Sequence, residues 1–187
     1  MPTKKEYAMK RVLILSGSPR KGGNSDILCD EFIKGAHKNG NDVEKIFVAE
    51  KKISPCTGCY FCKNHGGRCA FNDDMTDILQ KIIDCDVLVL STPVYFYSMC
   101  AQLKTLIDRT VARWTEIANK DLYYIMTAAD DEENTMDGTL ASLHGFAMCI
   151  DGYEEKGILY GKGVYEKGAV LARPELLQIA REMGESV

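Results

Sequence analysis

Two groups of residues in this chain have the types and spacing that chemistry requires. The first is a run of hydroxyl, basic and glycine residues from Ser16 to Ser25, and the second is a set of four cysteines between Cys56 and Cys69. Hydroxyls, an arginine and glycine-rich backbone bind anions, whereas clustered thiolates bind metals. The sequence therefore predicts an anion site and a metal site, and the elements around each group indicate which anion and which metal.

The first group lies between a buried strand and a helix. Four consecutive apolar residues, Val12 to Leu15, are typical of a strand buried on both faces. Leu28, Phe32 and Ala36 then recur at helical spacing, with Asn24 in the position of an N-cap. This order directs backbone N–H groups and the positive end of a helix dipole to one point, where we expect a phosphate. The residues expected to bind it are Ser16, Ser18, Arg20, Asn24 and Ser25.

The turn differs from the two common nucleotide-binding motifs. Gly17 and Gly22 have the spacing of a Walker loop, but Gly23 and Asn24 stand where that loop needs Lys and then Ser or Thr. No G-x-G-x-x-G follows the strand, so a dinucleotide turn is absent from the sequence. A mononucleotide suits the loop better, and the alternative is an ordinary strand-to-helix turn with an exposed basic tip.

Strand and helix patterns alternate along the rest of the chain. This alternation predicts right-handed crossovers and an α/β fold, a doubly wound five-stranded parallel sheet of flavodoxin-like order 2-1-3-4-5. We expect a single flavodoxin-like domain over residues 1–187 that binds a mononucleotide, with a cysteine-rich loop at about 49–72. The later strands are expected at Asp42 to Val48, Val87 to Leu90, Leu122 to Met126 and Gly157 to Gly161, and the later helices from Asp73, over Leu103 to Trp114, over Asn134 to Cys149 and over Pro174 to Met183.

Ligands of such sheets bind outside the carboxyl ends of the strands, where the strand order reverses. After the expected third strand, Pro93 to Ser98 offers aromatic faces and backbone N–H groups, and after the fourth, Thr127 to Ala129 offers small residues. A phosphate pocket beside such a slot fits a flavin mononucleotide, whereas the plain alternative is a hydrophobic loop that packs on its neighbours. The residues expected along the flavin ring are Pro93, Val94, Tyr95, Phe96, Tyr97, Ser98, Thr127 and Ala128.

The cysteine group has the spacing C-x2-C-x2-C-x6-C. Consecutive C-x2-C steps suit a [4Fe–4S] cluster, whereas zinc sites more often pair two separated C-x2-C knuckles. Free thiols in a loop at a subunit contact are a further alternative. The expected metal ligands are Cys56, Cys59, Cys62 and Cys69, and the other cysteines, Cys29, Cys85, Cys100 and Cys149, are expected to be small buried hydrophobes.

Composition excludes several classes of function. The chain has 187 residues, a net charge of −4 and an isoelectric point near 5.5, which argues against a general binder of nucleic acids or membrane surfaces. No apolar run reaches membrane-spanning length and the first residues lack the apolar core of a secretion signal, so we expect a cytoplasmic protein.

The segments GSPRKGGNSDIL and PVYFYSMCAQLKTLIDR resemble the NADPH-dependent FMN reductase family, and CTGCYFCKNHGGRCAFNDDM resembles the iron–sulfur flavoproteins within it. The resemblance implies FMN on the residues named above, NAD(P)H as co-substrate, and assembly into homodimers or homotetramers. Because hydride transfer takes place on the flavin, no catalytic side chain is predicted.

The expected function is that of an FMN-dependent NAD(P)H oxidoreductase that passes electrons to a small-molecule acceptor. The alternative is an iron–sulfur flavoprotein electron carrier, with a [4Fe–4S] cluster and FMN, that takes electrons from a ferredoxin-like partner. A third hypothesis is a non-catalytic module that senses phosphate or is stabilised by zinc.

Overall fold

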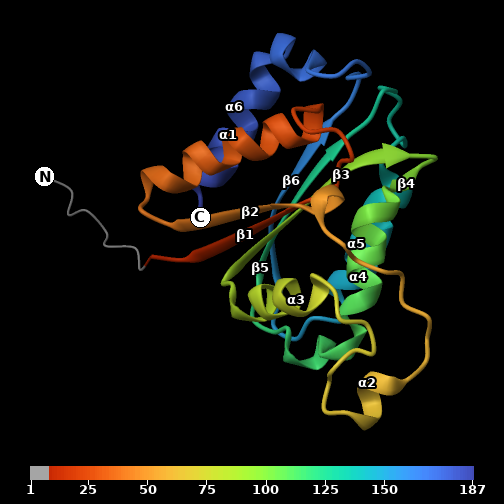
Figure 1. The fold of residues 1–187 in the computed structure, drawn as a ribbon. Helices are drawn as coiled ribbons and strands as arrows, with labels where there is room; N and C mark the ends of the chain where they lie inside the picture. Colours follow the sequence, from red (N-terminus) through yellow and green to blue (C-terminus); the bar gives the residue numbers. More distant parts are fainter. Residues whose placement is uncertain (1–8) are drawn as a thin grey trace, which may run out of the picture.

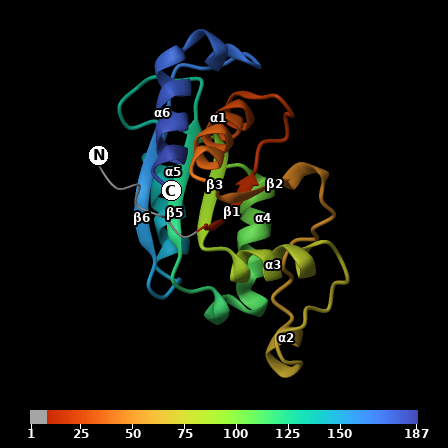
Figure 2. The same ribbon diagram turned by 90° about the vertical axis from the view of Figure 1, so that its left-hand side faces the viewer.

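The computed structural model describes residues 9–187, which form a central sheet covered by helices on both faces (Figures 1 and 2). Five parallel strands lie in the order β2-β1-β3-β5-β6, and the short β4 pairs antiparallel with β3. The strands are β1 (Arg11–Ser16), β2 (Asp42–Phe47), β3 (Val87–Tyr95), β4 (Ser98–Met99), β5 (Asp121–Thr127) and β6 (Glu154–Gly161). The α-helices are α1 (Asn24–Lys38), α2 (Phe61–Asn64), α3 (Met75–Asp84), α4 (Ala101–Arg109), α5 (Asp137–Ala147) and α6 (Pro174–Glu185), and the 3-10 turns are η1 (Val48–Glu50), η2 (Thr110–Ala112), η3 (Trp114–Glu116) and η4 (Ala169–Ala172).

The central strands are buried on both faces, as their apolar runs predict. In β1, Val12 and Ile14 pack in the cluster under α1 and α6, whereas Leu13 and Leu15 pack in the cluster under α3, α4 and α5. This alternation follows from the two-residue period of a strand. Among residues 9–187, no helix has both the length and the apolar character needed to cross a membrane.

Helices α1 and α6 approach each other so closely that glycine is required at the contact. A Cβ atom on Gly35 would lie 2.0 Å from the Arg181 carbonyl oxygen, and one on Gly184 would lie 2.0 Å from the Phe32 carbonyl oxygen. The close contact fixes α6, and with it the segment that precedes α6, against the amino-terminal part of the chain.

The flavodoxin-like parallel sheet is confirmed, but the predicted count of five strands is wrong because β4 makes a sixth. The strand expected at Val87 to Leu90 continues to Tyr95 and turns back. Pairing between β1 and β3 ends at Ser91. Beyond it, β3 pairs with β4, with Val94 opposite Met99 and Tyr95 opposite Ser98, so β4 replaces β1 as the neighbouring strand.

Three smaller expectations are also wrong. Helix α4 ends at Arg109 and gives way to 3-10 turns, which leaves Val111 and Trp114 about half exposed rather than on a buried helix face. Cys149, expected to be buried, is exposed. Gly23, not Asn24, occupies the N-cap of α1, so Asn24 is the first helical residue.

Candidate functional site

The turn after β1, the end of β3 and the end of β5 meet in one cavity of about 150 Å³, called here the strand-end cavity. It lies at the point where the strand order reverses, because the chain runs from β1 to β2 on one side and then returns to place β3 on the other side of β1. The sequence-predicted residues that line it are Ser18, Arg20, Asn24, Ser25, Pro93, Val94, Tyr95 and Thr127.

Two predicted residues are buried away from this cavity. Ser16 is fully buried, and its hydroxyl donates to Asp26 Oδ1 at 3.3 Å. Its side chain therefore does not reach the cavity to make the expected phosphate contact. The physical reason is strand alternation, because Ser16 shares a face with Ile14 and points toward α1. Ala128 is also buried and its N–H donates to the Gly161 carbonyl at 3.0 Å, whereas Ala129 lines the cavity instead.

Three further predicted residues, Phe96, Tyr97 and Ser98, form the exposed part of the β3–β4 hairpin and do not line the cavity. Phe96 and Tyr97 have φ values of 49° and 60° and make a two-residue turn between paired Tyr95 and Ser98. Left-handed backbone is unfavourable for such bulky side chains, and strained residues of this kind cluster at functional sites. The fully exposed ring of Phe96 therefore projects from a strained turn at the edge of the cavity.

The β1–α1 turn is held in shape by its own hydrogen bonds. The Arg20 N–H donates to Ser18 Oγ at 3.1 Å, and the Gly23 N–H donates to the Arg20 carbonyl at 2.9 Å. A Cβ atom on Gly17 would lie 2.9 Å from Cys100 Sγ and from the Ser91 carbonyl oxygen, so only glycine lets the turn pass this close to β3. The first N–H groups of α1 then have no partner within the helix and are available to an anion.

A buried ion pair neutralises the acid nearest this turn. Asp26 accepts hydrogen bonds from Lys45 Nζ and from the Gly22 N–H, both at 2.8 Å. Burial acts to raise the pKa of Asp26, but these two hydrogen bonds outweigh it and hold the pKa below its usual value. Asp26 is therefore charged and internally balanced, so it shapes the turn without repelling a phosphate at the cavity.

Sequence reasoning missed the side of the cavity that comes from the connection after β6. Val164, Tyr165 and Lys167 line it there, and Gly23 lines it at the start of α1. The rule that ligands bind at the carboxyl ends of parallel strands applies to β6 as it does to β3 and β5. The lysine and tyrosine that follow this strand are the pattern that could have indicated the site.

All four predicted metal ligands, Cys56, Cys59, Cys62 and Cys69, line a second cavity of about 200 Å³, called here the cysteine cavity. Four thiols around one space are a donor set that fits an iron–sulfur cluster or a zinc ion. The thiols line the same space but do not converge: in the described part of the chain, no three cysteine, histidine or acidic side chains are grouped closely enough to hold a metal ion. Hydrogen bonds from the Phe61 backbone and the Thr57 side chain lower the pKa of the Cys59 thiol, which favours the thiolate that a metal requires.

Arg109 closes the base of the cysteine segment. Its guanidinium makes a two-pronged ion pair with Asp73, at 2.8 and 2.9 Å, and donates to the Ser54 carbonyl at 2.6 Å. Lys52 and Asp74 pair next to it through backbone and side-chain hydrogen bonds. The two ends of residues 55–72, called here the cysteine segment, are therefore held together at one fixed place on the domain.

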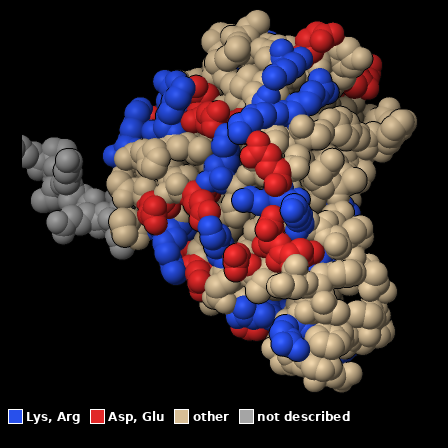
Figure 3. Space-filling model, in the orientation of Figure 1, with Lys and Arg blue, Asp and Glu red and all other residues tan. Residues whose placement is uncertain are grey.

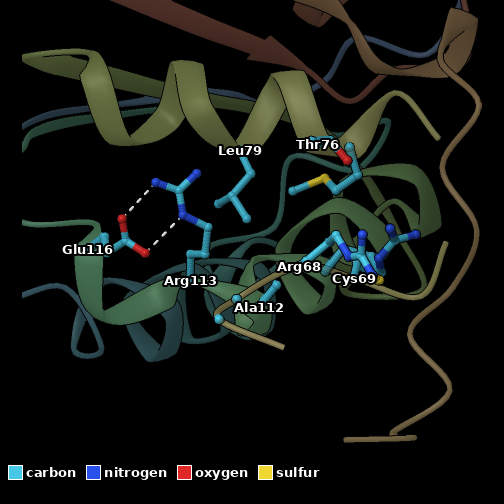
Figure 4. A pocket seen from close by; sticks show the side chains of 11 residues that line it. Arg68, Cys69, Thr76, Leu79, Ala112, Arg113 and Glu116 are labelled. Atoms are coloured by element: carbon cyan, nitrogen blue, oxygen red, sulfur yellow. Dashed lines mark hydrogen bonds and ion pairs between the residues drawn. The ribbon is translucent and has the colours of Figure 1, made fainter. Parts of the chain in front are cut away.

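Arg109 and Cys69 also line a cavity of about 400 Å³ on the α3 side, shown in Figure 4. Its far wall contains the ion pair between Arg113 and Glu116. Arg109 Nε is buried without a hydrogen-bond partner among the described residues, and the Arg109 side chain lines both this cavity and the cysteine cavity, as Cys69 does.

The cysteine cavity and the strand-end cavity lie at opposite ends of the molecule. Both views place α2 of the cysteine segment at the lower end and the turns after β1, β5 and β6 at the upper end (Figures 1 and 2). Within one chain the two candidate sites are therefore separate.

Comparison with curated proteins places the chain among flavin-dependent proteins. It is 31% identical over 185 residues to an iron-sulfur flavoprotein of Methanocaldococcus jannaschii, a match that covers 95% of each chain. It is also 43% identical over 101 residues to an iron-sulfur flavoprotein of Archaeoglobus fulgidus, which covers 54% of this chain and 45% of that protein.

Solved structures share the fold. An NAD(P)H:quinone oxidoreductase from Methanothermobacter marburgensis superposes with a TM-score of 0.70 at 18% identity over 96% of each chain. An FMN-dependent NADH-azoreductase from Bacillus anthracis has a TM-score of 0.70 at 19% identity, over 95% of this chain and 97% of the other. The sequence model described as NADPH-dependent FMN reductase matches residues 10–144, and the chain belongs to this family.

Proposed function

We propose that the chain binds FMN in the strand-end cavity and works as an oxidoreductase that passes electrons from NAD(P)H to a small-molecule acceptor. The observation that carries this proposal is the convergence of the β1–α1 turn with Pro93, Tyr95 and Thr127 around one cavity. Family membership supports the flavin and the nicotinamide donor. Bound FMN supplies hydride chemistry, and the protein supplies binding and orientation.

Each wall of the cavity has a separate task in this proposal. Ser18, Arg20 and Ser25 bind the phosphate beside the amino-terminal end of α1. Pro93 to Tyr95 and Thr127 flank one edge of the ring. The cavity is smaller than the several hundred cubic ångströms of a typical ligand pocket, so the exposed hairpin tip beside it would flank the rest of the ring.

The test is reduction of the FMN-loaded protein by NADPH and by NADH under anaerobic conditions, followed by addition of a quinone. Loss of flavin absorbance with either nucleotide, and its recovery with the quinone, is the expected result. A bound flavin that neither nucleotide reduces would overturn the NAD(P)H oxidoreductase assignment and leave FMN binding intact.

The second candidate function is electron transfer through FMN and a [4Fe–4S] cluster, with a ferredoxin-like partner as donor. It is favoured by the four cysteines around one cavity and by the iron-sulfur flavoproteins among the relatives. We propose a homodimer or homotetramer for this function, because the two cavities lie at opposite ends of one chain and electrons would pass between chains. Iron and sulfide analysis after anaerobic purification, with reduced ferredoxin compared against NADPH as donor, separates the two candidates.

A further inference from the structure

The strand-end cavity is lined by two basic side chains, Arg20 and Lys167, that have no counter-ion. Within residues 9–187, neither side chain makes an ion pair or donates a hydrogen bond. Their neighbour Lys21, by contrast, is held by Glu50 at 3.0 Å and does not line the cavity. Two uncompensated cations at the amino-terminal end of a helix favour an anion of more than one charge.

Lys167 comes from the far end of the sequence and lies against the β1–α1 turn. A Cβ atom built on Gly22 would lie 3.5 Å from Lys167 Cε and 3.9 Å from its Nζ. Residues 162–170, the first part of the connection between β6 and α6, carry this lysine across the start of α1. The family match ends at residue 144, so this segment lies outside the matched region.

Asn24 holds the 162–170 segment in place. Its Nδ2 donates to the carbonyls of Val164 and Glu166 at 3.1 and 2.9 Å, and its Oδ1 accepts from the Val170 N–H at 3.1 Å. These bonds use both amide hydrogens of Asn24, so no side-chain hydrogen remains for a phosphate. The side chain expected to bind phosphate therefore fixes the loop that carries Lys167.

We propose that Lys167 is the second cationic ligand of the FMN phosphate, besides Arg20, and that Asn24 is the positioning residue that holds it there. This inference rests on the proposed FMN binding. A phosphate monoester carries between one and a half and two negative charges at neutral pH, which one arginine does not balance. The inference assigns a binding role to the carboxyl-terminal segment and replaces the expected role of Asn24.

The first experiment compares the dissociation constants of FMN and riboflavin, which differ by the phosphate alone. Lys167→Met is expected to weaken FMN binding roughly tenfold or more and to leave riboflavin binding unchanged. Lys167→Arg should restore most of the affinity. Lys21→Met removes one charge from the same turn without touching the cavity, and its effect should stay below about threefold.

Several results would overturn the inference. They are an unchanged FMN affinity in Lys167→Met, an equal loss for FMN and riboflavin, and an equal loss in Lys21→Met. Failure of the unaltered chain to bind FMN at all would instead overturn the proposed function, and the inference with it.

The second experiment tests the positioning role of Asn24 with a double-mutant cycle. If Asn24 acts through Lys167, Asn24→Ala should weaken FMN binding as Lys167→Met does, and the double variant should lose little more. Fully additive losses in FMN affinity would show that Asn24 acts independently of Lys167 and would contradict the positioning role. Because Asn24→Ala also releases a loop, Lys167→Met alone decides the role of the lysine if the asparagine variant fails to fold.

Discussion

Arg109 is the bulkiest fully buried side chain in the described part of the chain, and its charge is matched by Asp73. The pair joins α4 to both ends of the cysteine segment through the Ser54 carbonyl and the Asp73 carboxylate. A buried charge without its partner is strongly destabilising, so the stability at the two ends of the cysteine segment is sensitive to single substitutions in this pair.

Arg109→Met should lower the free energy of unfolding by about 3–5 kcal/mol, because it leaves the Asp73 carboxylate without its cation. Urea denaturation gives the measurement. Arg113→Met is the matched control, since its pair with Glu116 is partly exposed and should contribute far less to stability. Equal effects of the two substitutions would contradict the structural role given to Arg109.

Asp73 makes this stability depend on pH. Burial acts to raise its pKa, but hydrogen bonds from Arg109 and the Ser54 N–H hold the pKa below the ordinary value of 3.8. Its contribution is therefore present above the pKa of the unfolded chain and is lost as the pH falls through the lower pKa of the folded state. The difference in unfolding free energy between the unaltered chain and Asp73→Asn should shrink on going from neutral pH to below 3.8. A constant difference in unfolding free energy across that range would contradict a role of the Asp73 charge in stability.

At the scale of elements, the β3–β4 hairpin is the clearest departure from ordinary turn chemistry. Its two turn positions favour Asn and Gly, yet they hold Phe96 and Tyr97 in left-handed conformations. The strain at the tip therefore coincides with the aromatic surface proposed to lie against the flavin ring.

Replacing the turn with Asn at 96 and Gly at 97 should raise the stability by about 1 kcal/mol, because it removes two unfavourable left-handed residues. The same change should weaken FMN binding, because it removes two aromatic side chains. Thermal unfolding and flavin titration give the two readouts. Tyr60→Asn is the control, since Tyr60 has a φ of 58° in the cysteine segment and should gain stability without altering flavin affinity. Unchanged FMN affinity in the hairpin variant would remove the aromatic turn from the flavin site.

The cluster proposed for the cysteine segment should be lost independently of the flavin. Cys59→Ser is expected to abolish iron and sulfide binding and to leave FMN content unchanged, because the two cavities are separate. Cys149→Ser is the control, an exposed thiol outside the segment. Loss of iron and flavin together in Cys59→Ser would mean that the segment supports the whole domain.

The predictable elements are those in which local pattern and tertiary structure agree. Apolar runs such as Val87 to Leu90 predicted the parallel strands because those strands are buried on both faces. The hairpin was not predictable from turn residues, because Phe96 and Tyr97 are not the residues that such a turn favours. Lys167 was not assigned because its place depends on hydrogen bonds from Asn24, more than a hundred residues away.

At the scale of the whole molecule, the two candidate sites lie at opposite ends, and the surface between them is uneven in charge. Figure 3 shows few charged side chains on the right-hand side, where β4 and the cysteine segment lie in Figure 1. Exposed Phe96, Tyr97 and Tyr60 belong to these two segments. This weakly charged surface supports the proposed assembly of chains.

The central claim is that the strand-end cavity holds FMN. The most direct test is the visible absorbance of the anaerobically purified, desalted chain, before and after incubation with FMN. If FMN is bound, the protein should show a flavin spectrum that survives desalting and is bleached by NAD(P)H. A colourless protein that gains no flavin absorbance on incubation with FMN would contradict it.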